Sequence, residues 1–308
     1  MKKTTDLPKI SVLINTRNEG EKLEKCLGSV SFADEIVVTD MESSDESVSI
    51  AKKHHANVFP ILHEQVIERA RNFGIGKTTG DWILVLDPDE EISETLREKL
   101  LEIAGNSSCD FVRIPRKNII FGRWMTHAGW WPDYLVRFFR KEAISWRENI
   151  HSIPETRGKG IELEAREEMA IIHHHYETIS QYFERMERYT KVQAEERSAF
   201  GYKFLWQDFI RKPLSEFLSR FFFYEGYRDG VHGLALCLLQ AFSELVIYLR
   251  IWEKEKFSQS ENSEKEVFKE ITNGLKETNY WRITKSASGS FIKKLTGKIK
   301  LKMQRILL

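Results

Sequence analysis

The first hundred residues switch repeatedly between two hydrophobic periods. Short, nearly continuous apolar runs are typical of strands buried on both faces, whereas apolar positions three or four apart indicate amphipathic helices. The strand-like runs cover residues 10–15, 35–39, 57–62 and 81–86, and the helical stretches cover residues 19–30, 45–54, 63–78 and 93–104. Strand–helix alternation predicts an α/β, Rossmann-like unit with a parallel sheet covered on both faces.

The pattern changes after residue 110. Strand-like segments at residues 111–115, 134–139 and 170–173 are separated by loops rich in Trp, Arg and Gly rather than by helices. Strands without intervening crossover helices are typical of antiparallel pairing. We therefore expect a mostly parallel sheet with an antiparallel extension, forming one domain over residues 1–176.

The rest of the chain has helical spacing from residue 177 to residue 252. Residues 253–277 are charged and poor in apolar residues, which fits either a linker or a solvated helix. From Arg282 the chain carries eight Lys or Arg residues and no acidic residue. Apolar residues among these cations indicate a surface-lying amphipathic helix, with a disordered tail as the alternative. We expect a helical, acceptor-binding or membrane-proximal region over residues 177–252 and a charged linker with a basic tail over residues 253–308.

Composition limits the classes of function. The 308 residues carry a net charge of +1, which gives no global case for binding nucleic acid. The three cysteines lack metal or redox spacing and fit reduced thiols in the cytoplasm. The N-terminus is polar, so we expect no signal peptide. The longest apolar stretch, residues 233–252, is interrupted by Gln240, Glu244 and Arg250, which favours a buried or membrane-surface helix over a membrane crossing.

Acidic residues cluster where the predicted strands end. Asp87, Asp89, Glu90 and Glu91 follow the fourth strand, and like charges this close raise one another's pKa. A divalent cation with oxygen ligands would resolve that conflict and commonly holds a substrate phosphate. The carboxyl ends of strands are also where ligands bind in open α/β sheets. The sequence therefore predicts a site at this rim.

The first two strands end in polar turns that should lie on the same rim. Asp40 follows a strand that looks buried, which favours a functional role for its carboxylate. Ser43, Ser44 and Asp45 fit helix caps equally well.

Several motifs in this order resemble family 2 glycosyltransferases of GT-A fold. They are Asn15-Thr-Arg-Asn-Glu19, Val37-Val-Thr-Asp40-Met-Glu-Ser43-Ser44-Asp45, Ala70-Arg71-Asn72, Gly80-Asp81-Trp82 and Leu86-Asp87-Pro-Asp89-Glu90. Later motifs are similar to the branch that includes bacterial lipopolysaccharide-core β-glucosyltransferases. They are Gly129-Trp-Trp-Pro-Asp133, Arg137-Phe-Phe-Arg140, Ile150-His151, His175-Tyr176, Arg188-Tyr189-Thr190 and Tyr227-Arg-Asp-Gly230 with Gly233. The similarity covers about residues 10–250.

This resemblance implies inverting transfer of a sugar from a nucleotide-sugar donor, assisted by Mg²⁺ or Mn²⁺ as Lewis acid. By similarity, a nucleoside pocket is lined by Thr16, Arg17 and Glu19, with Asp40 on the base or ribose and Arg71 near the donor phosphates. Asp87 and Asp89 form the family's Asp-x-Asp element. Asp89 would bind the metal directly, and Asp87 would hold the ribose or a metal-bound water.

Inversion also needs a carboxylate base near the acceptor hydroxyl. Related enzymes tend to carry His-Glu where this chain has His151-Ser152, so Asp133, Glu148 and Glu155 all stay open, with Glu148 favoured.

Two further sets of residues could join the site. One histidine of residues 173–175 could complete the Asp89-bound cation, because residues 173 and 175 share one strand face. Trp124, Trp130 and Trp131 either stack on a sugar or belong to the core.

The turn after the first strand lacks the glycine pattern of a dinucleotide-binding dehydrogenase. It also lacks the glycine-rich phosphate loop of a sugar-nucleotide pyrophosphorylase, so both classes of enzyme are excluded. The sequence therefore favours the hypothesis of a cytoplasmic enzyme, peripheral on the inner face of the cell membrane, that glycosylates a lipopolysaccharide core or related envelope glycan. Its expected partners are a nucleotide-sugar donor, a lipid-linked glycan acceptor and an anionic membrane surface. The alternative is a catalytically inactive scaffold or membrane-binding protein that keeps the fold.

Overall fold

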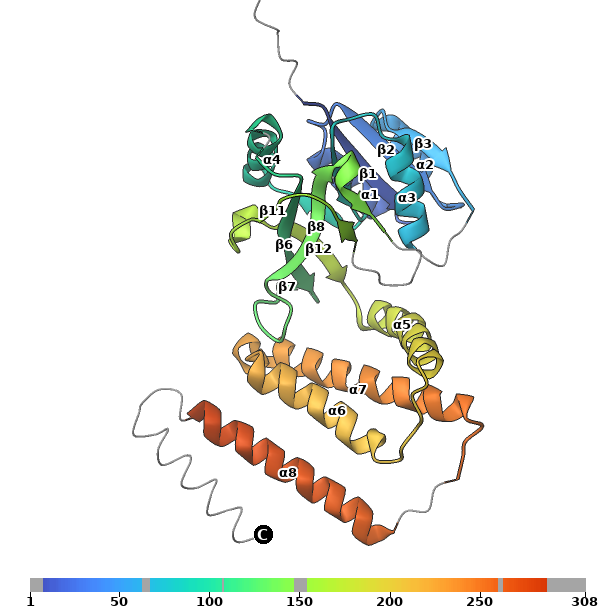
Figure 1. Cartoon of the computed structure of the whole chain (residues 1–308), viewed down its shortest axis with the longest axis vertical. Helices are drawn as coiled ribbons and strands as arrows, with labels where there is room; N and C mark the ends of the chain where they lie inside the picture. Colours follow the sequence, from blue (N-terminus) through green and yellow to red (C-terminus); the bar gives the residue numbers. More distant parts are fainter. Residues whose placement is uncertain (1–7, 63–66, 107, 147–153, 260–262, 287–308) are drawn as a thin grey trace, which may run out of the picture. The chain divides into compact units, whose positions relative to one another are not determined.

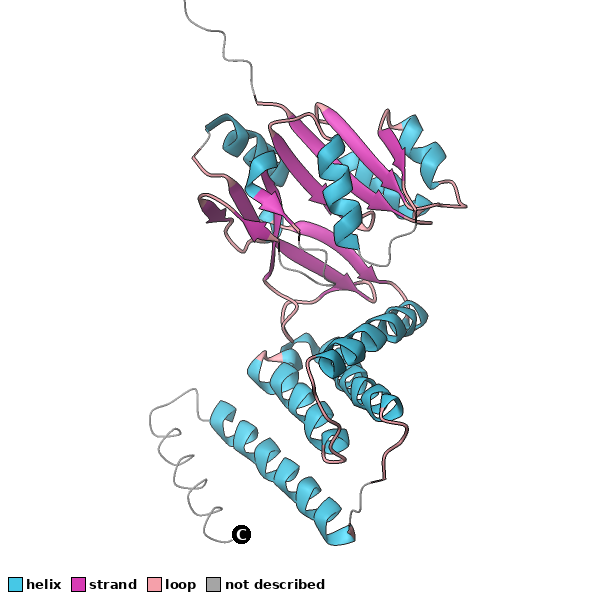
Figure 2. Cartoon of the chain, turned by 45° about the vertical axis from the view of Figure 1, so that its right-hand side comes forward, coloured by secondary structure: helices cyan, strands magenta, loops and turns pink. Residues whose placement is uncertain are grey.

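The computed structural model describes residues 8–62, 67–106, 108–146, 154–259 and 263–286. The chain divides into two compact units. An α/β unit contains the residues up to 120 together with 131–175, and a helical unit contains 121–130 and the chain from residue 176 onward. Figure 2 shows that nearly all strands, in magenta, belong to the first unit, whereas helices, in cyan, make up most of the second.

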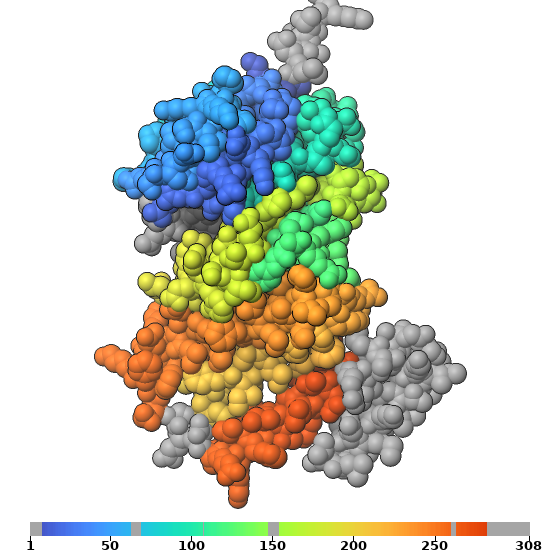
Figure 3. Space-filling view, turned by 180° about the vertical axis from the view of Figure 1, so that it is seen from behind, coloured from blue at the N-terminus to red at the C-terminus, as the bar shows by residue number. Residues whose placement is uncertain are grey.

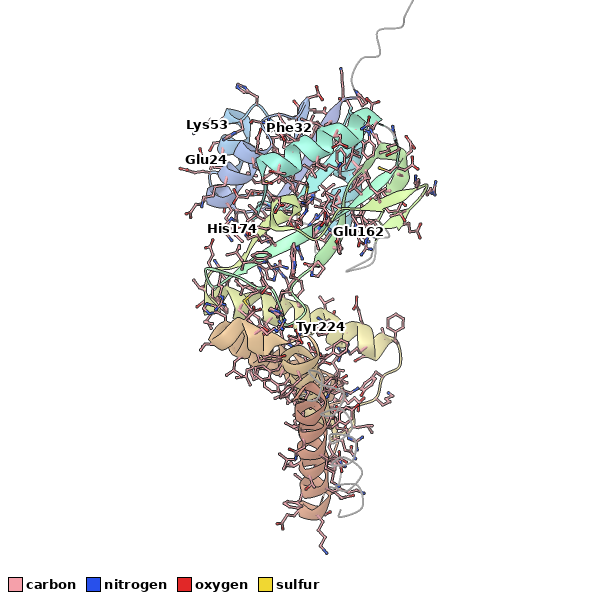
Figure 4. All side chains as sticks on the ribbon, turned by 90° about the vertical axis from the view of Figure 1, so that its left-hand side faces the viewer. Glu24, Phe32, Lys53, Glu162, His174 and Tyr224 are labelled. Atoms are coloured by element: carbon pink, nitrogen blue, oxygen red, sulfur yellow. The ribbon has the colours of Figure 1, made fainter. Side chains whose placement is uncertain are left out.

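Four parallel strands form one half of the sheet in the α/β unit, in the order β3-β2-β1-β4. The strands are β1 (Ile10–Thr16), β2 (Glu35–Asp40), β3 (Asn57–Pro60) and β4 (Trp82–Leu86), and the helices that alternate with them are α1 (Gly20–Ser29), α2 (Ser47–Lys53), α3 (Ile67–Lys77) and α4 (Glu94–Asn106). An exposed ion pair at 2.9 Å joins Glu24 of α1 to Lys53 of α2 (Figure 4). The predicted strand–helix alternation is confirmed.

Every residue of β1 and β4 is buried, because both faces of these strands are covered. On one face, alternate residues such as Val12 and Leu84 pack with α1, α2 and α4. On the other face, Leu13 and Ile83 pack against Ile75 of α3. Continuous apolar strands give two cores, one on each side of the sheet.

An antiparallel half completes the sheet and confirms the predicted extension. From β4 the order continues β8-β6-β12-β5, with β11 beside β6. These strands are β5 (Glu90–Ile92), β6 (Phe111–Ile120), β8 (Asp133–Arg140), β11 (Gly160–Glu162) and β12 (Ile171–Tyr176); a separate short pair joins β9 (Ile144–Ser145) to β10 (Glu155–Thr156). Strand β5 was not predicted. It is too short to show a hydrophobic period, and it pairs with β12 directly after the acidic turn.

The helical unit confirms the helical pattern predicted for residues 177–252. Its helices are α5 (Ile179–Ala199), α6 (Asp208–Leu218), α7 (Gly230–Lys254) and α8 (Glu264–Ser286), with a π turn at Ser219–Phe223 and a 3-10 turn at Gly226–Asp229. Helix α8 (Figure 1) replaces the linker alternative over residues 264–277. Most of the basic tail in which we expect an amphipathic helix, from residue 287 onward, lies outside the described residues.

Close packing joins the start of α7 to the turn before it. A Cβ atom on Gly233 would collide with the carbonyl oxygen of Gly226, so only glycine fits there. The buried carboxylate of Asp229 accepts hydrogen bonds from Thr126 Oγ1 at 2.9 Å and from the backbone N–H of His127 at 2.8 Å. These bonds fix residues 121–130 within the helical unit.

Candidate active site at the carboxyl ends of the parallel strands

Three polar turns meet at one edge of the α/β unit because β2, β1 and β4 are adjacent and parallel. The register places Thr16 of β1 opposite Asp40 of β2, and Ile14 of β1 opposite Leu86 of β4. Asp87 therefore follows at the level of Asn15. The rim predicted from the strand ends is the rim that the fold forms.

The turns after β1 and β2 are held together by hydrogen bonds. The backbone N–H of Asn18 donates to Ser43 Oγ at 2.9 Å, and its side chain accepts from the backbone N–H of Ser44 at 2.7 Å. Asp45 Oδ2 accepts from the backbone N–H of Gly20 at 3.0 Å. Burial raises the pKa of Asp45, but hydrogen bonds from Ser47 and Gly20 outweigh it and lower that pKa. Asn18 and Ser43 join the two turns, and Asp45 accepts from the first backbone N–H of α1, so together these side chains fix the rim.

Beneath these turns, the strand ends retain polar atoms that the protein does not satisfy. Asn15 Nδ2, Thr16 Oγ1 and Asp40 Oδ1 are buried, and none has a hydrogen-bond partner among the described residues. The other oxygen of Asp40 accepts from the backbone N–H of Ser43 at 3.2 Å. An unpaired buried polar group costs about 1–3 kcal/mol. Three such atoms on two adjacent strand ends indicate a place where water or a ligand supplies the missing partners.

The Asp-x-Asp turn has the opposite character, because its first carboxylate is already paired. Asp87 Oδ1 lies 2.9 Å from Arg71, and Asp87 Oδ2 lies 2.5 Å from Arg137. Burial would raise the pKa of Asp87, but Arg137 and Arg71 hold it well below its usual range. The sequence argument assigned the compensation of this charge to a cation. In the structure, arginine supplies it at Asp87.

Glu90 extends the same network into the core. Its side chain is fully buried, and Oε1 lies 3.2 Å from both Arg116 and Arg137, while Oε2 accepts from the backbone N–H of Asp87 at 2.9 Å. Burial would lower the pKa of Arg137, but Asp87 and Glu90 raise it above its usual value. Sequence reasoning missed Glu90, Arg116 and Arg137 as a set. The available signal was Arg137 itself, a charged residue within an otherwise apolar strand. A buried charge needs a partner, so an acidic residue was to be expected near it.

Asp89, in contrast, faces histidines. His173 Nε2 lies 3.6 Å from Asp89 Oδ1 and 3.2 Å from His175 Nδ1. His173 Nδ1 lies 2.7 Å from Asn118 Oδ1, so it donates there and leaves Nε2 as an acceptor in the neutral ring. An acceptor nitrogen facing a carboxylate oxygen is an arrangement that a bound cation would stabilise. His174, labelled in Figure 4, contacts Glu91 instead, at 2.8 Å.

These groups fit a metal that is shared with a substrate. Among the residues described, no group of three or more His, Cys, Asp or Glu side chains is placed to hold an ion. Mg²⁺ usually takes one or two protein carboxylates and completes its shell with water and substrate phosphates. Asp89 suits that mode, and His173 or His175 would add a nitrogen ligand that Mn²⁺ accepts more readily than Mg²⁺ does. The set does not suit a dedicated protein-only site.

Comparison with known proteins agrees with this geometry. Residues 11–158 match the model of glycosyl transferase family 2. Residues 11–158 are therefore a glycosyltransferase family 2 domain. An uncharacterized glycosyltransferase of Rickettsia bellii is 31% identical over 148 residues, which is 47% of this chain and 50% of that protein. One of Rickettsia conorii is 24% identical over 278 residues, covering 87% of this chain and 98% of that protein.

Solved structures show weaker likeness to this family 2 glycosyltransferase. A mannosyltransferase from Pyrobaculum calidifontis, in complex with GDP-Man and Mn²⁺, aligns with a TM-score of 0.46 at 11% identity over 96% of this chain and 88% of its own. Residues 1–349 of S. aureus TarS, in complex with UDP-GlcNAc, align with a TM-score of 0.44 at 15% identity over 82% and 93%.

The remaining predicted site residues differ in exposure and in their partners. Arg17 is exposed, and Glu19 lies 3.4 Å from Lys22. Asp133 Oδ2 accepts from Arg116 at 2.7 Å and from Asn118 at 3.2 Å, and Glu155 is exposed on β10. Glu148, the favoured base, lies outside the described residues. The roles given to these side chains stay predictions.

Proposed function

We propose that this glycosyltransferase is an inverting, metal-dependent enzyme that moves a sugar from a nucleotide-sugar donor to a lipopolysaccharide core or related cell-envelope glycan. The observation that carries the proposal is the juxtaposition of the unsatisfied atoms of Asn15, Thr16 and Asp40 with the Asp-x-Asp turn. A nucleoside diphosphate has the matching parts: a base and ribose rich in donors and acceptors, and a charged diphosphate.

The nucleoside would bind at the ends of β1 and β2. Asp40 can accept a hydrogen bond from a base N–H or a ribose hydroxyl, and Asn15 and Thr16 can donate to base or ribose oxygens. Arg71, fixed by Asp87, carries a positive charge beside the turn and would face the donor phosphates. Arg17 and Glu19 complete this pocket in the proposal.

Asp89, with His173 or His175, would hold Mg²⁺ or Mn²⁺. When bound, such an ion supplies Lewis-acid stabilisation of the negative charge on the departing nucleoside diphosphate. The chain's own contribution is to fix these ligands. Asn118 sets the tautomer of His173, and the backbone N–H of His174 donates to the carbonyl oxygen of Asp89 at 2.9 Å. Arg137 pairs with both Asp87 and Glu90, which would keep the turn compact when an ion is bound.

The proton of the acceptor hydroxyl needs a base on the opposite side of the sugar. We keep Glu148 as the favoured candidate. Asp133 is less suited, because its Oδ2 already accepts three hydrogen bonds from Arg116 and Asn118. The lipid-linked acceptor and the location on the inner face of the cell membrane are part of the same proposal and are supported by the basic tail from Arg282.

Thermal-shift measurements with UDP, GDP, ADP and dTDP, each with and without Mn²⁺, test the donor proposal. A ligand that binds only the native state raises the melting temperature. We expect one nucleotide to stabilise the protein in the presence of Mn²⁺, with Asp40→Asn reducing the shift and the exposed control Glu46→Gln leaving it unchanged. No shift with any of the four, and no hydrolysis of their sugar conjugates, would support the inactive-scaffold alternative instead.

A further inference from the structure

Helix α7 exposes a continuous apolar face in the helical unit. The exposed positions follow helical spacing and carry no charge: Val231, Leu234, Leu238, Phe242 and Leu249. Positions three, four or seven apart lie on one side of a helix. We call these five residues the α7 stripe. Figure 3 shows α7, in orange, at the surface of this unit.

Four polar residues of α7 from Gln240 onward (Gln240, Ser243, Glu244 and Arg250) contact α5 instead. Gln240 Nε2 donates to the hydroxyl of Tyr182 at 2.9 Å, and the same hydroxyl lies 2.8 Å from Ser243 Oγ. Glu244 pairs with Arg197 at 2.9 Å. Six residues later, Arg250 donates to Thr190 Oγ1 at 3.1 Å and pairs with Glu187 at 2.6 Å.

The two helices therefore have opposite polarity. Helix α5 turns charged side chains outward, among them Glu184, Arg188, Lys191 and Glu195. Helix α7 turns its polar groups inward and leaves its apolar face exposed. A water-soluble helix normally buries its apolar stripe, so the α7 stripe needs an apolar partner.

The stripe continues onto one aromatic residue of α5, and further aromatic residues are exposed in the turns before α7. Phe183 of α5 is exposed, and its ring lies 6.4 Å from that of Phe242 in an edge-to-face arrangement. Just before α7, Phe223, Tyr224 and Tyr227 are exposed as well. Aromatic side chains of this kind are enriched where a protein meets the boundary between membrane and water.

Length alone would also allow α7 to cross a membrane. Within the described residues, Gly226–Lys254 is the one helix that is long and apolar enough, with a mean hydropathy of 1.7 over its best window, and 33% of that window is buried. Crossing would carry the ion pairs of Glu244 and Arg250 with α5 into hydrocarbon, where charged groups are expensive. A helix with one apolar face and one paired polar face instead lies in the membrane surface.

We propose that the α7 stripe is the surface by which this protein docks on an anionic lipid bilayer. The charge of the chain favours lipid over a second copy as the occupant: residues 282–308 carry eight Lys or Arg and no acidic residue. Anionic headgroups complement those cations, whereas a second copy would bring the same cations to them. The proposal deepens the membrane association in the proposed function, and it can fail while the donor chemistry stands.

Co-sedimentation of the full chain with vesicles of phosphatidylglycerol and phosphatidylcholine tests the proposal. The variant Val231→Gln/Leu238→Gln removes two residues of the stripe. The matched control, Leu62→Gln/Leu101→Gln, changes two residues of the α/β unit that are equally exposed: 76% and 45%, against 80% for Val231 and 53% for Leu238. We expect the vesicle partition coefficient of the stripe variant to be at least roughly tenfold lower, because two apolar side chains no longer move from water into lipid. The control should bind as the native protein does.

Two measurements keep a failure interpretable. Thermal unfolding and the nucleotide-induced shift should be the same in both variants, which separates docking from folding and from donor binding. Unchanged vesicle binding by the stripe variant overturns the proposal. It is equally overturned if the native protein ignores vesicles and forms a dimer that the stripe variant dissociates, since a second copy would then cover the stripe.

Discussion

The rim at the ends of β1 and β2 differs from the Asp-x-Asp turn beside it in how its polar groups are satisfied. At the strand ends, Asn15, Thr16 and Asp40 keep buried atoms without partners among the described residues. At the turn, Asp87 and Glu90 share Arg71, Arg116 and Arg137. The strand ends keep hydrogen-bonding groups that a ligand can satisfy, whereas most charges of the turn are paired within the protein. This difference is the basis of our proposal that the nucleoside binds at the strand ends while the arginine network holds the turn in shape.

Removing Arg137 should have the largest effect on stability, because it breaks the buried ion pairs of the Asp-x-Asp turn. Arg137→Met leaves the buried Glu90 with a single arginine, and breaking a buried pair costs about 3–5 kcal/mol. Urea denaturation should show that loss. Arg140→Met is the matched control on the same strand: its partner Asp110 lies 3.8 Å away at the surface, and such pairs contribute about 0–1 kcal/mol. Equal losses in both variants would mean that the network does not stabilise the turn.

Asp89→Asn should leave the fold intact and lower sugar transfer about 100-fold or more, since a preorganised charge at the reacting centre is usually a large catalytic term. Donor hydrolysis and transfer assays over a range of Mn²⁺ concentrations measure the loss. Glu91→Gln is the control, because the Glu91 carboxylate pairs with the His174 ring and is not one of the proposed metal ligands. Full activity of Asp89→Asn would contradict the metal role.

Thr16→Val sharpens the description of the strand ends. The hydroxyl has no described partner, so an apolar group of the same shape should leave the stability of the free protein unchanged or slightly higher. Nucleotide affinity should fall about tenfold, as expected for one lost hydrogen bond of about 1.4 kcal/mol. Denaturation and calorimetric titration report the two quantities. A loss of stability without a loss of affinity would make Thr16 structural.

The pH dependence of stability gives the smallest effect. Burial opposes ionisation of Asp87, but Arg137 and Arg71 hold its folded-state pKa well below that of the unfolded chain. Its stabilising contribution is therefore fully present above the unfolded pKa of about 3.9 and is lost as pH falls through the lower folded value. The difference in unfolding free energy between the native protein and Asp87→Asn should be constant from neutral pH to about pH 5 and shrink below about pH 4. A difference that changes between pH 6 and 8 would point to another group.

Much of the fold follows from local pattern. The apolar runs within β1 and β4 predicted their burial, and alternating periods predicted the helices. The rim followed from strand order, since adjacent parallel strands carry Asp40, Thr16 and Asp87 to one edge.

Long-range pairing could not be predicted. The arginines that neutralise the acidic turn come from positions up to 50 residues away, as in the pair of Asp87 with Arg137, and no local period encodes that contact. Strand β5 was missed for the same reason, since its partner β12 lies far along the chain. Helix α7 shows the related difficulty that composition identifies an apolar helix without telling which face stays exposed.

Titration of Mn²⁺, followed by the signal of the free ion in electron paramagnetic resonance, tests the central claim most directly. Because fewer than three described side chains are placed to hold an ion, the account predicts weak binding of Mn²⁺ alone and much tighter binding with the nucleoside diphosphate that stabilises the protein. Asp89→Asn should abolish that gain, and Thr16→Val should reduce it. Tight Mn²⁺ binding without nucleotide, or nucleotide binding indifferent to both Mn²⁺ and Asp89, would contradict the account.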